Sequence, residues 1–242
     1  MQEYLSPLNV ERFDGYNNYL QSAFGILISA HTPENFPELE NIDLAILGVE
    51  EDRNSVNNEG CALAPNYIRE HLYKLCQGDF TSHIADLGNI KKGNTVDDTY
   101  FALTDVIHQL LKKKIIPIII GGSQDLTYSN YLAYKNIEPT INIVAIDSFL
   151  DLGKADEELN ARNYLTKIVM HKPNMLFNFS NVGYQTYFVE QSQLDLMSKF
   201  YFDAHRLGQV NSNIEEVEPI VRNADVLSFD VSAIRHSDAT GN

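Results

Sequence analysis

Short apolar runs that each end in a polar cluster recur along the chain. The clearest pair lies in residues 115–151, where Ile115–Ile120 runs into Gly-Gly-Ser-Gln-Asp and Ile141–Ile146 runs into Asp-Ser-Phe-Leu-Asp. Runs this short and this rich in β-branched residues are typical of strands buried on both faces of a parallel sheet. Ligands bind beyond the carboxyl ends of such strands. We therefore expect Gly121–Asp125 and Asp147–Asp151 to lie close together and to form a site.

The same patterns predict the other elements of the fold. Further strands are expected at Ile42–Val49, Ile84–Asn89, Ser180–Tyr184 and Val226–Val231. A helix is predicted to begin near Ala64 and to bury Ile68, Leu72 and Leu75. A second helix is predicted to be capped by Thr95 or Asp97 and to bury Leu103, Val106, Ile107, Leu110 and Leu111. Further helices are predicted at Leu126–Tyr134, Asn160–Met170, Gln191–Phe200 and Asn213–Val221.

Alternation of strands and helices predicts an α/β fold, in which a mainly parallel sheet is covered by helices on both faces. No internal repeat, low-complexity tract or linker interrupts this alternation, so residues 1–242 are interpreted as a single domain.

The composition of the chain limits the classes of binding partner that are expected. The chain of 242 residues has a formal net charge of -15 and two cysteines. A strongly acidic protein is repelled by nucleic acid and by anionic membrane surfaces, so neither is expected as a partner. The sequence has no apolar run of ~20 residues and no signal peptide, which predicts a cytoplasmic protein without a membrane span. Two cysteines in a chain of this length do not form a disulfide framework.

Aspartates follow the predicted strands and suggest a metal site. Asp147 and Asp151 follow Ile141–Ile146, and Asp230 follows Val226–Phe229. Several carboxylates at neighbouring strand ends repel one another unless a cation lies among them, which favours a divalent metal ion. The same spacing is also found where aspartates cap a following helix or lie in a solvated loop. These structural roles are commoner than a metal site. A third interpretation is a small anion bound at Gly121–Gln124, at the start of a helix.

Four segments resemble the ureohydrolase family of arginases, agmatinases and formimidoylglutamases. Ile-Ile-Gly-Gly-Ser-Gln-Asp resembles a strand that ends in Gly-Gly-Asp-His-Ser, and Val-Ala-Ile-Asp-Ser-Phe-Leu-Asp resembles a segment with Asp-Ala-His-x-Asp. Leu-Ser-Phe-Asp-Val-Ser is similar to Ser-Phe-Asp-x-Asp. Gly-Cys-Ala-Leu-Ala-Pro-Asn-Tyr-Ile-Arg is similar to an early Gly-x-x-x-Gly-Pro-x-x-Ile-Arg stretch. The resemblance implies a three-layer arginase-like α/β fold and a pair of manganese ions that activate a bridging hydroxide.

Position by position, the resemblance implies a metal site that has lost ligands. Three aspartates are retained, namely Asp147, Asp151 and Asp230. Gln124 stands at the position of the first histidine ligand, where it is a weak neutral donor. Phe149 and Ser232 stand at two further ligand positions, and a phenyl ring cannot coordinate a metal. At most one Mn²⁺ or other divalent ion is expected here, and the site is interpreted as vestigial.

Three hypotheses follow from these residues. In the first, the protein has a degraded dimanganese centre, is catalytically weak or inactive, and acts as a binding or scaffold subunit in a homo-oligomer. In the second, it is an active metal-dependent hydrolase of a small amidine or guanidine, of the formimidoylglutamase or arginase type. In the third, it is an unrelated α/β domain that binds a small anion. The resemblance also predicts a C-terminally incomplete chain, because family members continue beyond their third motif.

Overall fold

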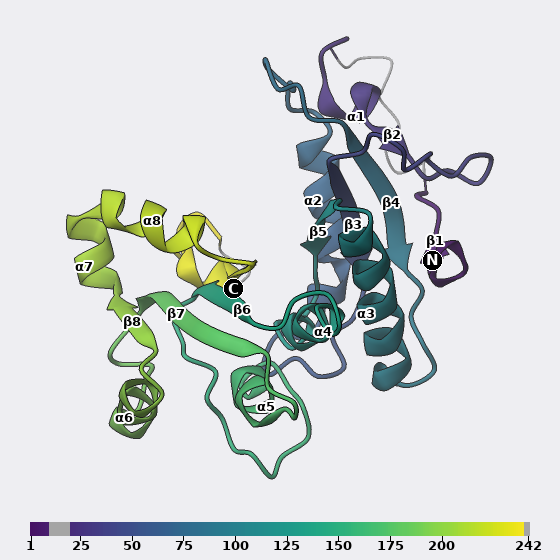
Figure 1. Cartoon of the computed structure of the whole chain (residues 1–242). Coiled ribbons are helices and arrows are strands. Elements are labelled where there is room, and N and C mark those ends of the chain that lie inside the picture. The colour runs from purple at the N-terminus through teal and green to yellow at the C-terminus, as the bar shows by residue number, and fades with distance from the viewer. Residues whose placement is uncertain (10–19, 240–242) are drawn as a thin grey trace. The chain divides into compact units, whose positions relative to one another are not determined.

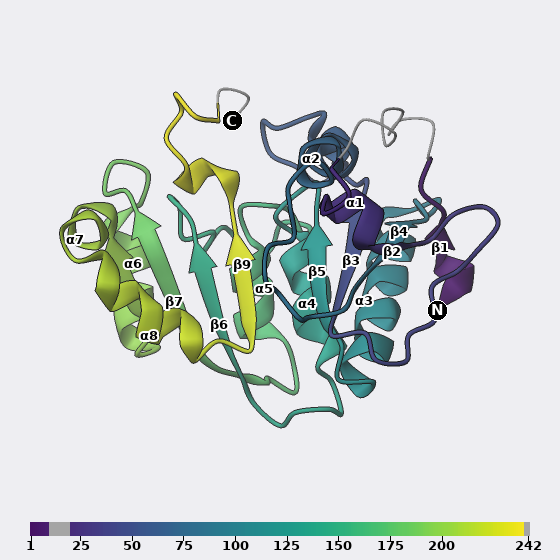
Figure 2. The ribbon, with the colours of Figure 1, turned by 90° about the horizontal axis from the view of Figure 1, so that it is seen from above.

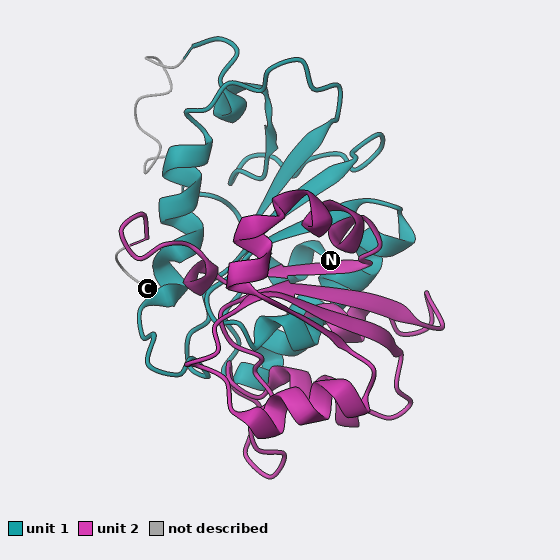
Figure 3. Ribbon diagram, turned by 90° about the vertical axis from the view of Figure 1, so that its left-hand side faces the viewer, with its two compact units in different colours: residues 1–129 teal, residues 130–242 magenta. Residues whose placement is uncertain are grey.

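The computed structural model describes residues 1–9 and 20–239 of the chain. These residues form two compact units, Met1–Ser129 and Asn130–Asn242, which are coloured separately in Figure 3. The division falls inside one helix. Each unit combines a sheet with helices, as the alternation of elements predicts, whereas the interpretation of 1–242 as a single domain stays a prediction.

The described residues of the first unit form five strands and four α-helical segments, the last of which runs into the second unit. Its strands are β1 (Leu5–Ser6), β2 (Ser29–Ala30), β3 (Leu44–Val49), β4 (Ile84–Ile90) and β5 (Ile116–Ile120). Its helices are α1 (Phe24–Leu27), α2 (Ala64–Leu72), α3 (Val96–Lys112) and α4 (Leu126–Ala133), with 3-10 turns at Gln2–Tyr4 and Cys61–Leu63.

The sheet of the first unit has β3 and β4 in its interior. The strand order is β1-β4-β3-β5, with β2 also paired to β4, and only β1 runs antiparallel to its neighbour. Four residues of β3, namely Ala45, Ile46, Leu47 and Val49, are almost fully buried, so both faces of this strand are covered. By contrast, Ile116 in β5 is 61% exposed. The expectation that β5 is buried on both faces is therefore wrong. Among the described strands β5 pairs with β3 alone and forms an edge of this sheet.

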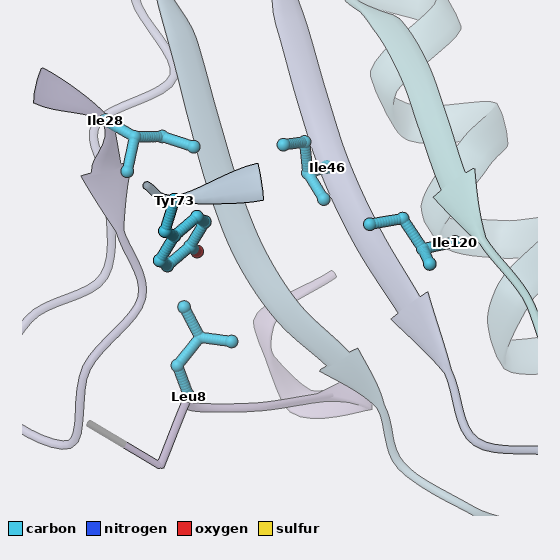
Figure 4. Close-up of a cluster of buried hydrophobic side chains, with 5 residues drawn as sticks. All are labelled: Leu8, Ile28, Ile46, Tyr73 and Ile120. Carbon is cyan, nitrogen blue, oxygen red and sulfur yellow. The ribbon is translucent and has the colours of Figure 1, made fainter. Parts of the chain in front are cut away.

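One core cluster packs against a face of this sheet. Figure 4 shows Leu8, Ile28, Ile46, Tyr73 and Ile120 gathered there, from five separate parts of the chain. Tyr73 comes directly after α2 and is fully buried. Burial of apolar side chains of this size contributes roughly 1.5–3 kcal/mol each, which fixes α2 and the N-terminal segment on the sheet.

Helix α2 buries only part of the face that its sequence predicts, since Leu72 packs against the core cluster but its predicted neighbours do not. Ile68 and Leu75 are 44% and 60% exposed, whereas Arg69 is fully buried. Arg69 forms a two-pronged ion pair with Asp86 of β4, from Nε at 2.7 Å and from Nη2 at 2.9 Å. The hydroxyl of Tyr73 also donates to Asp86, at 2.7 Å. The charged pair therefore places Arg69 toward the sheet, beside Leu72, and leaves Ile68 and Leu75 exposed.

Helix α3 agrees with its predicted cap and apolar face. The backbone amide of Asp98 donates a hydrogen bond to the Thr95 hydroxyl at 3.1 Å, and the backbone amide of Thr95 donates to the Asp98 carboxylate at 2.8 Å, so a capping box is complete. Leu103, Val106, Ile107 and Leu110 are buried, and Leu111 is partly buried.

The second unit contains a four-stranded sheet in which every pair is parallel. Its strands are β6 (Ile141–Ile146), β7 (Leu176–Tyr184), β8 (Asp203–Arg206) and β9 (Val226–Phe229), in the order β8-β7-β6-β9. Its helices are α5 (Tyr164–Met170), α6 (Gln191–Lys199), α7 (Leu207–Ser212) and α8 (Val217–Arg222), with 3-10 turns at Ile214–Glu216 and Val231–Ala233. Figure 1 shows α5 and α6 on one face of this sheet and α7 and α8 on the other.

Strands β6 and β9 lie side by side and point the same way, as Figure 2 shows. The pairing register places Ile146 opposite Phe229. The residues that come next, Asp147 and Asp230, therefore leave the sheet together at one edge. The sequence predicts this arrangement, but it does not predict β8 and α7, whose short segments lack a clear apolar period.

Candidate functional site

Two of the predicted site residues occupy the carboxyl ends of neighbouring strands. The amide of Asp147 donates to the carbonyl of Val182 in β7, at 3.1 Å, and the amide of Asp230 donates to the carbonyl of Ile146, at 3.0 Å. The backbone of both aspartates is thus fixed by the sheet itself. Ser232 links their carboxylates, because its amide donates to Asp230 and its hydroxyl donates to Asp147. The two residues thus follow neighbouring strands, as the sequence predicts, whereas a shared metal site stays a prediction.

Asp151 joins them from the loop that follows β6. Its carboxyl group lies near that of Asp147, whose charge is one of the causes that raise the pKa of Asp151. The backbone of Asp151 has φ of 48°, in the left-handed region. Aspartate tolerates this region better than most residues, and the turn returns its side chain toward the strand end. The side chain is 4% exposed, so the carboxyl group is almost completely removed from water.

Burial shifts the protonation of this cluster. Desolvation, followed by the charge of Asp230, raises the pKa of Asp147 to about 6. Desolvation, followed by the charge of Asp147, raises the pKa of Asp151 well above its ordinary value. Both shifts favour the protonated, uncharged form of these two carboxyl groups.

Hydrogen bonds from nearby residues hold the carboxylates of Asp147 and Asp230. Oδ1 of Asp147 accepts from the amide of Phe149 at 2.9 Å and from the hydroxyl of Ser232 at 3.1 Å. Oδ1 of Asp230 accepts from the amide of Ser232 at 2.7 Å, which caps the short turn Val231–Ala233. The common interpretation, in which an aspartate at a strand end caps the next turn, is confirmed for Asp230.

Two buried oxygens in the cluster accept no hydrogen bond. These are Oδ2 of Asp147 and Oδ1 of Asp151. Oδ1 of Asp151 faces Nη1 of Arg162 at 3.6 Å, an ion pair longer than a hydrogen bond. The guanidinium carbon of Arg162 lies 3.5 Å from the centroid of the Phe149 ring. One cation of the chain itself is therefore in direct contact with the cluster.

The residues present do not fit a pair of metal ions. Among the residues that the structure describes, no group of three or more histidine, cysteine, aspartate and glutamate side chains is arranged to hold an ion. Phe149 and Ser232 supply a ring and a hydroxyl where a second ion would need ligands. The Arg162 guanidinium lies against that ring, and a fixed positive charge there opposes a metal ion. The orphaned oxygens of Asp147 and Asp151 are hard donors that suit at most one divalent cation.

Gln124 belongs to the first unit, at the loop between β5 and α4. In this loop a Cβ on Gly122 would lie 2.0 Å from the carbonyl oxygen of Glu51, so only glycine allows this close approach. The amide of Ser123 already donates to that carbonyl, at 3.0 Å. The role of Gln124 as a weak ligand stays a prediction.

Asp125 is tied into the first unit by side-chain contacts. Its carboxyl group is buried and accepts hydrogen bonds from the hydroxyls of Ser123 and Tyr100. Burial raises its pKa despite these bonds. The start of α4 therefore holds a buried acidic group of its own, which does not favour an anion at Gly121–Gln124.

A family model describes most of the chain. Residues 42–242 match the model of the arginase family. The chain belongs to the arginase family. Membership overturns the third hypothesis, in which the domain is unrelated to the ureohydrolases.

Curated relatives of the chain are bacterial proteins. The formimidoylglutamase of Lysinibacillus sphaericus is 30% identical over 140 residues, which are 56% of this chain and 43% of that protein. The formimidoylglutamase of Staphylococcus haemolyticus is 22% identical over 211 residues, which are 81% of this chain and 67% of that protein. The chain thus matches less than half the length of the first of these two relatives.

Solved structures share the fold. A Trypanosoma cruzi formiminoglutamase crystallised with Mn²⁺ superposes with a TM-score of 0.77 and 18% identity, over 89% of this chain and 77% of that one. The Bacillus subtilis formimidoylglutamase has a TM-score of 0.75 and 18% identity, over 89% of this chain and 72% of that one. The predicted arginase-like α/β fold is confirmed. In the part of the chain that the structure describes, no helix is long and apolar enough to cross a membrane.

Arg162 is the contact of the site that sequence reasoning missed. It lies in the irregular segment between β6 and α5, and no motif or period marks it. The only available signal was chemical: a buried acidic cluster requires a cation, and arginine is the residue that pairs best with both a carboxylate and an aromatic face.

Proposed function

We propose that this arginase-family protein has lost the dimanganese centre, does not hydrolyse amidines at a useful rate, and acts as a binding or scaffold subunit in a homo-oligomer. One observation carries the proposal. Arg162 lies on the ring of Phe149 and pairs with Asp151, at a position where the family resemblance expects a histidine ligand. A chain that places its own guanidinium against the cluster has little need of a metal pair.

Exposed apolar side chains on the second unit support the role in an assembly. Phe177 is 72% exposed and Tyr201 is 90% exposed. Large apolar groups that remain in water are common at protein interfaces, and a second copy of the chain is the partner proposed here.

A second candidate function is an active metal-dependent hydrolase of a linear amidine. It is favoured by the relatives, which are named formimidoylglutamases. It is also favoured by the buried oxygens of Asp147 and Asp151 that accept no hydrogen bond, which could serve as donors to a single ion. Water bound to one divalent cation is acidified, so chemistry with a single ion is consistent with these residues.

Metal analysis together with an activity assay separates the two functions. The chain is purified from cells grown with MnCl₂, its bound manganese is measured, and product release is followed with formiminoglutamate, arginine and agmatine. The first proposal predicts less than one Mn²⁺ per chain and no release above background. The Bacillus subtilis formimidoylglutamase serves as the positive control for the assay.

A matched variant assigns any activity that is observed. If turnover depends on Mn²⁺ and is lost in Asp147→Ala, the hydrolase is the correct function and the first proposal fails. Turnover that persists unchanged in Asp147→Ala arises outside the cluster, and the second proposal then fails.

A further inference from the structure

The loop between Gly153 and Arg162 is closed by hydrogen bonds, and this closure positions the Arg162 guanidinium. The amide of Gly153 donates to the carbonyl of Arg162 at 2.9 Å, which joins the two ends of the loop. The side chain of Asn160 accepts from the amide of Arg162, also at 2.9 Å. Residue 162 is therefore returned to the vicinity of Asp151 by its own backbone.

A buried asparagine locks the same loop from inside. Asn163 is 1% exposed, and its Oδ1 accepts from the amide of Asn160 at 2.8 Å. Its Nδ2 donates to the carbonyl of Glu158, also at 2.8 Å. Because these bonds satisfy a fully buried amide, the loop has one favoured conformation, in which the Arg162 side chain starts beside the cluster.

The ring of Phe149 is a fixed platform for a planar cation. Nδ2 of Asn181 in β7 donates to the carbonyl of Phe149, at 2.7 Å. The ring of Phe188 stacks on that of Phe149, with centroids 4.7 Å apart and planes inclined by 16°. A guanidinium group lies well on an aromatic face because it is planar, delocalised and weakly hydrated.

The neighbouring carboxyl group supplies the second half of the contact. Oδ1 of Asp151 is buried, accepts no hydrogen bond and faces Nη1 of Arg162 at 3.6 Å. A buried carboxylate without a partner destabilises the folded state, so a cation held next to it is stabilised electrostatically. The Arg162 side chain is 44% exposed, whereas the Asp151 side chain is 2% exposed. Part of the arginine therefore remains in water, while its partner carboxylate is buried.

We propose that the Phe149 ring and the Asp151 carboxylate form a guanidinium-binding position, and that the chain fills this position with its own Arg162 as the resident counter-cation of the carboxylate cluster. The inference deepens the proposed function, on whose metal-poor site it rests, but it concerns a contact that can be measured without any turnover. No other residue of the loop combines a ring contact and an ion pair to this cluster among the contacts described.

Removal of the side chain followed by chemical rescue tests this position. Hydrogen–deuterium exchange is measured for peptides that cover residues 147–163 in the full chain, without added metal ions, in wild type and in Arg162→Ala. The variant is expected to exchange several-fold faster in this segment. Millimolar methylguanidinium chloride is then expected to slow the exchange of Arg162→Ala and to leave wild type unchanged, because only the variant has the position open.

Controls separate this effect from general stabilisation. Arg222→Ala removes another arginine of the same unit, one that pairs with Glu218 on an exposed helix, and it is expected to leave residues 147–163 unaffected. Sodium chloride at the same concentration controls for ionic strength. The inference is overturned if Arg162→Ala exchanges like wild type, or if methylguanidinium acts equally, or not at all, on both proteins.

Failure of the inference and failure of the proposed function have different signatures. Mn²⁺-dependent turnover by wild type contradicts the proposed function, whatever the exchange data show. An unrescued Arg162→Ala contradicts the guanidinium position, even in a protein without activity.

Discussion

Ser232 donates a hydrogen bond to Oδ1 of Asp147 at 3.1 Å, between residues 85 positions apart in the chain. The same hydroxyl accepts a bond from Ser148, at 2.9 Å. Ser232 therefore links the end of β9 to the end of β6 through neutral side-chain bonds, at a position where the family resemblance expects a carboxylate ligand. Hydroxyl groups therefore link the two strand ends directly.

Removal of the Ser232 hydroxyl is expected to weaken this link. Ser232→Ala leaves Ser148 without its acceptor and Asp147 with one donor fewer, which costs about 1–2 kcal/mol of unfolding free energy. Urea unfolding followed by circular dichroism measures the change. Ser237→Ala, an exposed serine nearby, is the matched control and is expected to change little. Equal midpoints for the two variants would show that the link has no energetic role.

Asp147 gives the site a defined dependence on pH. Its pKa is raised by burial to about 6 in the folded chain, above the ordinary value of 3.8. The folded state therefore binds the proton more tightly than the unfolded state, and stability falls as the pH rises from about 4 to about 6. At pH 7 the ionised, buried carboxylate costs the folded state on the order of 2 kcal/mol.

Asp147→Asn removes this cost while it keeps an acceptor for Phe149 and Ser232. The variant is expected to be more stable than wild type at pH 7, by about 1–2 kcal/mol, and the difference is expected to vanish near pH 4, where wild type is protonated as well. Unfolding is measured across this range of pH. Asp156→Asn, an exposed aspartate in the following loop, is expected to produce no such trend. If Asp147→Asn is less stable than wild type at pH 7, the ionised Asp147 carboxylate does not destabilise the folded state and the prediction is wrong.

The buried pair in the first unit is expected to be a larger determinant of stability. Arg69 and Asp86 are both fully buried, and Arg69 also donates to the carbonyl of Gly88, at 3.0 Å. Arg69→Met leaves the Asp86 carboxylate without its cation, at a cost of about 3–5 kcal/mol. Urea unfolding of Arg222→Met, which breaks an exposed pair, is the comparison. If Arg69→Met and Arg222→Met have the same urea midpoint, the buried pair contributes no more to stability than the exposed one.

These residues show what could be predicted from the sequence and what could not. Asp147 and Asp230 were predictable as neighbours, because the apolar runs before them define parallel strands and parallel strands end at one edge. The face of α2 was not predictable from its leucines. Arg69 is buried through Asp86, which lies in another element, and no local pattern records that partnership. Arg162 escaped for the same reason, since its position depends on the closure of an irregular loop.

Gly153 is the residue on which that closure depends most directly. A Cβ at this position would lie 2.6 Å from the carbonyl oxygen of Arg162 and 3.0 Å from the Cβ of Asn163. Gly153→Ala therefore has to open the loop and draw Arg162 away from Asp151, at a cost of about 1–3 kcal/mol. Faster hydrogen exchange in residues 153–163 and a lower unfolding midpoint are expected together.

Gly208→Ala is the matched control for this glycine. Gly208 lies in helix α7 of the same unit, and a Cβ there would meet no atom within 4 Å. Alanine is favoured over glycine inside a helix by roughly 0.5–1 kcal/mol, so Gly208→Ala is expected to be neutral or stabilising. If Gly153→Ala is as stable as Gly208→Ala and exchanges at the wild-type rate, the loop does not need this close approach. The position of Arg162 would then have to be fixed by its contacts with Phe149 and Asp151 alone.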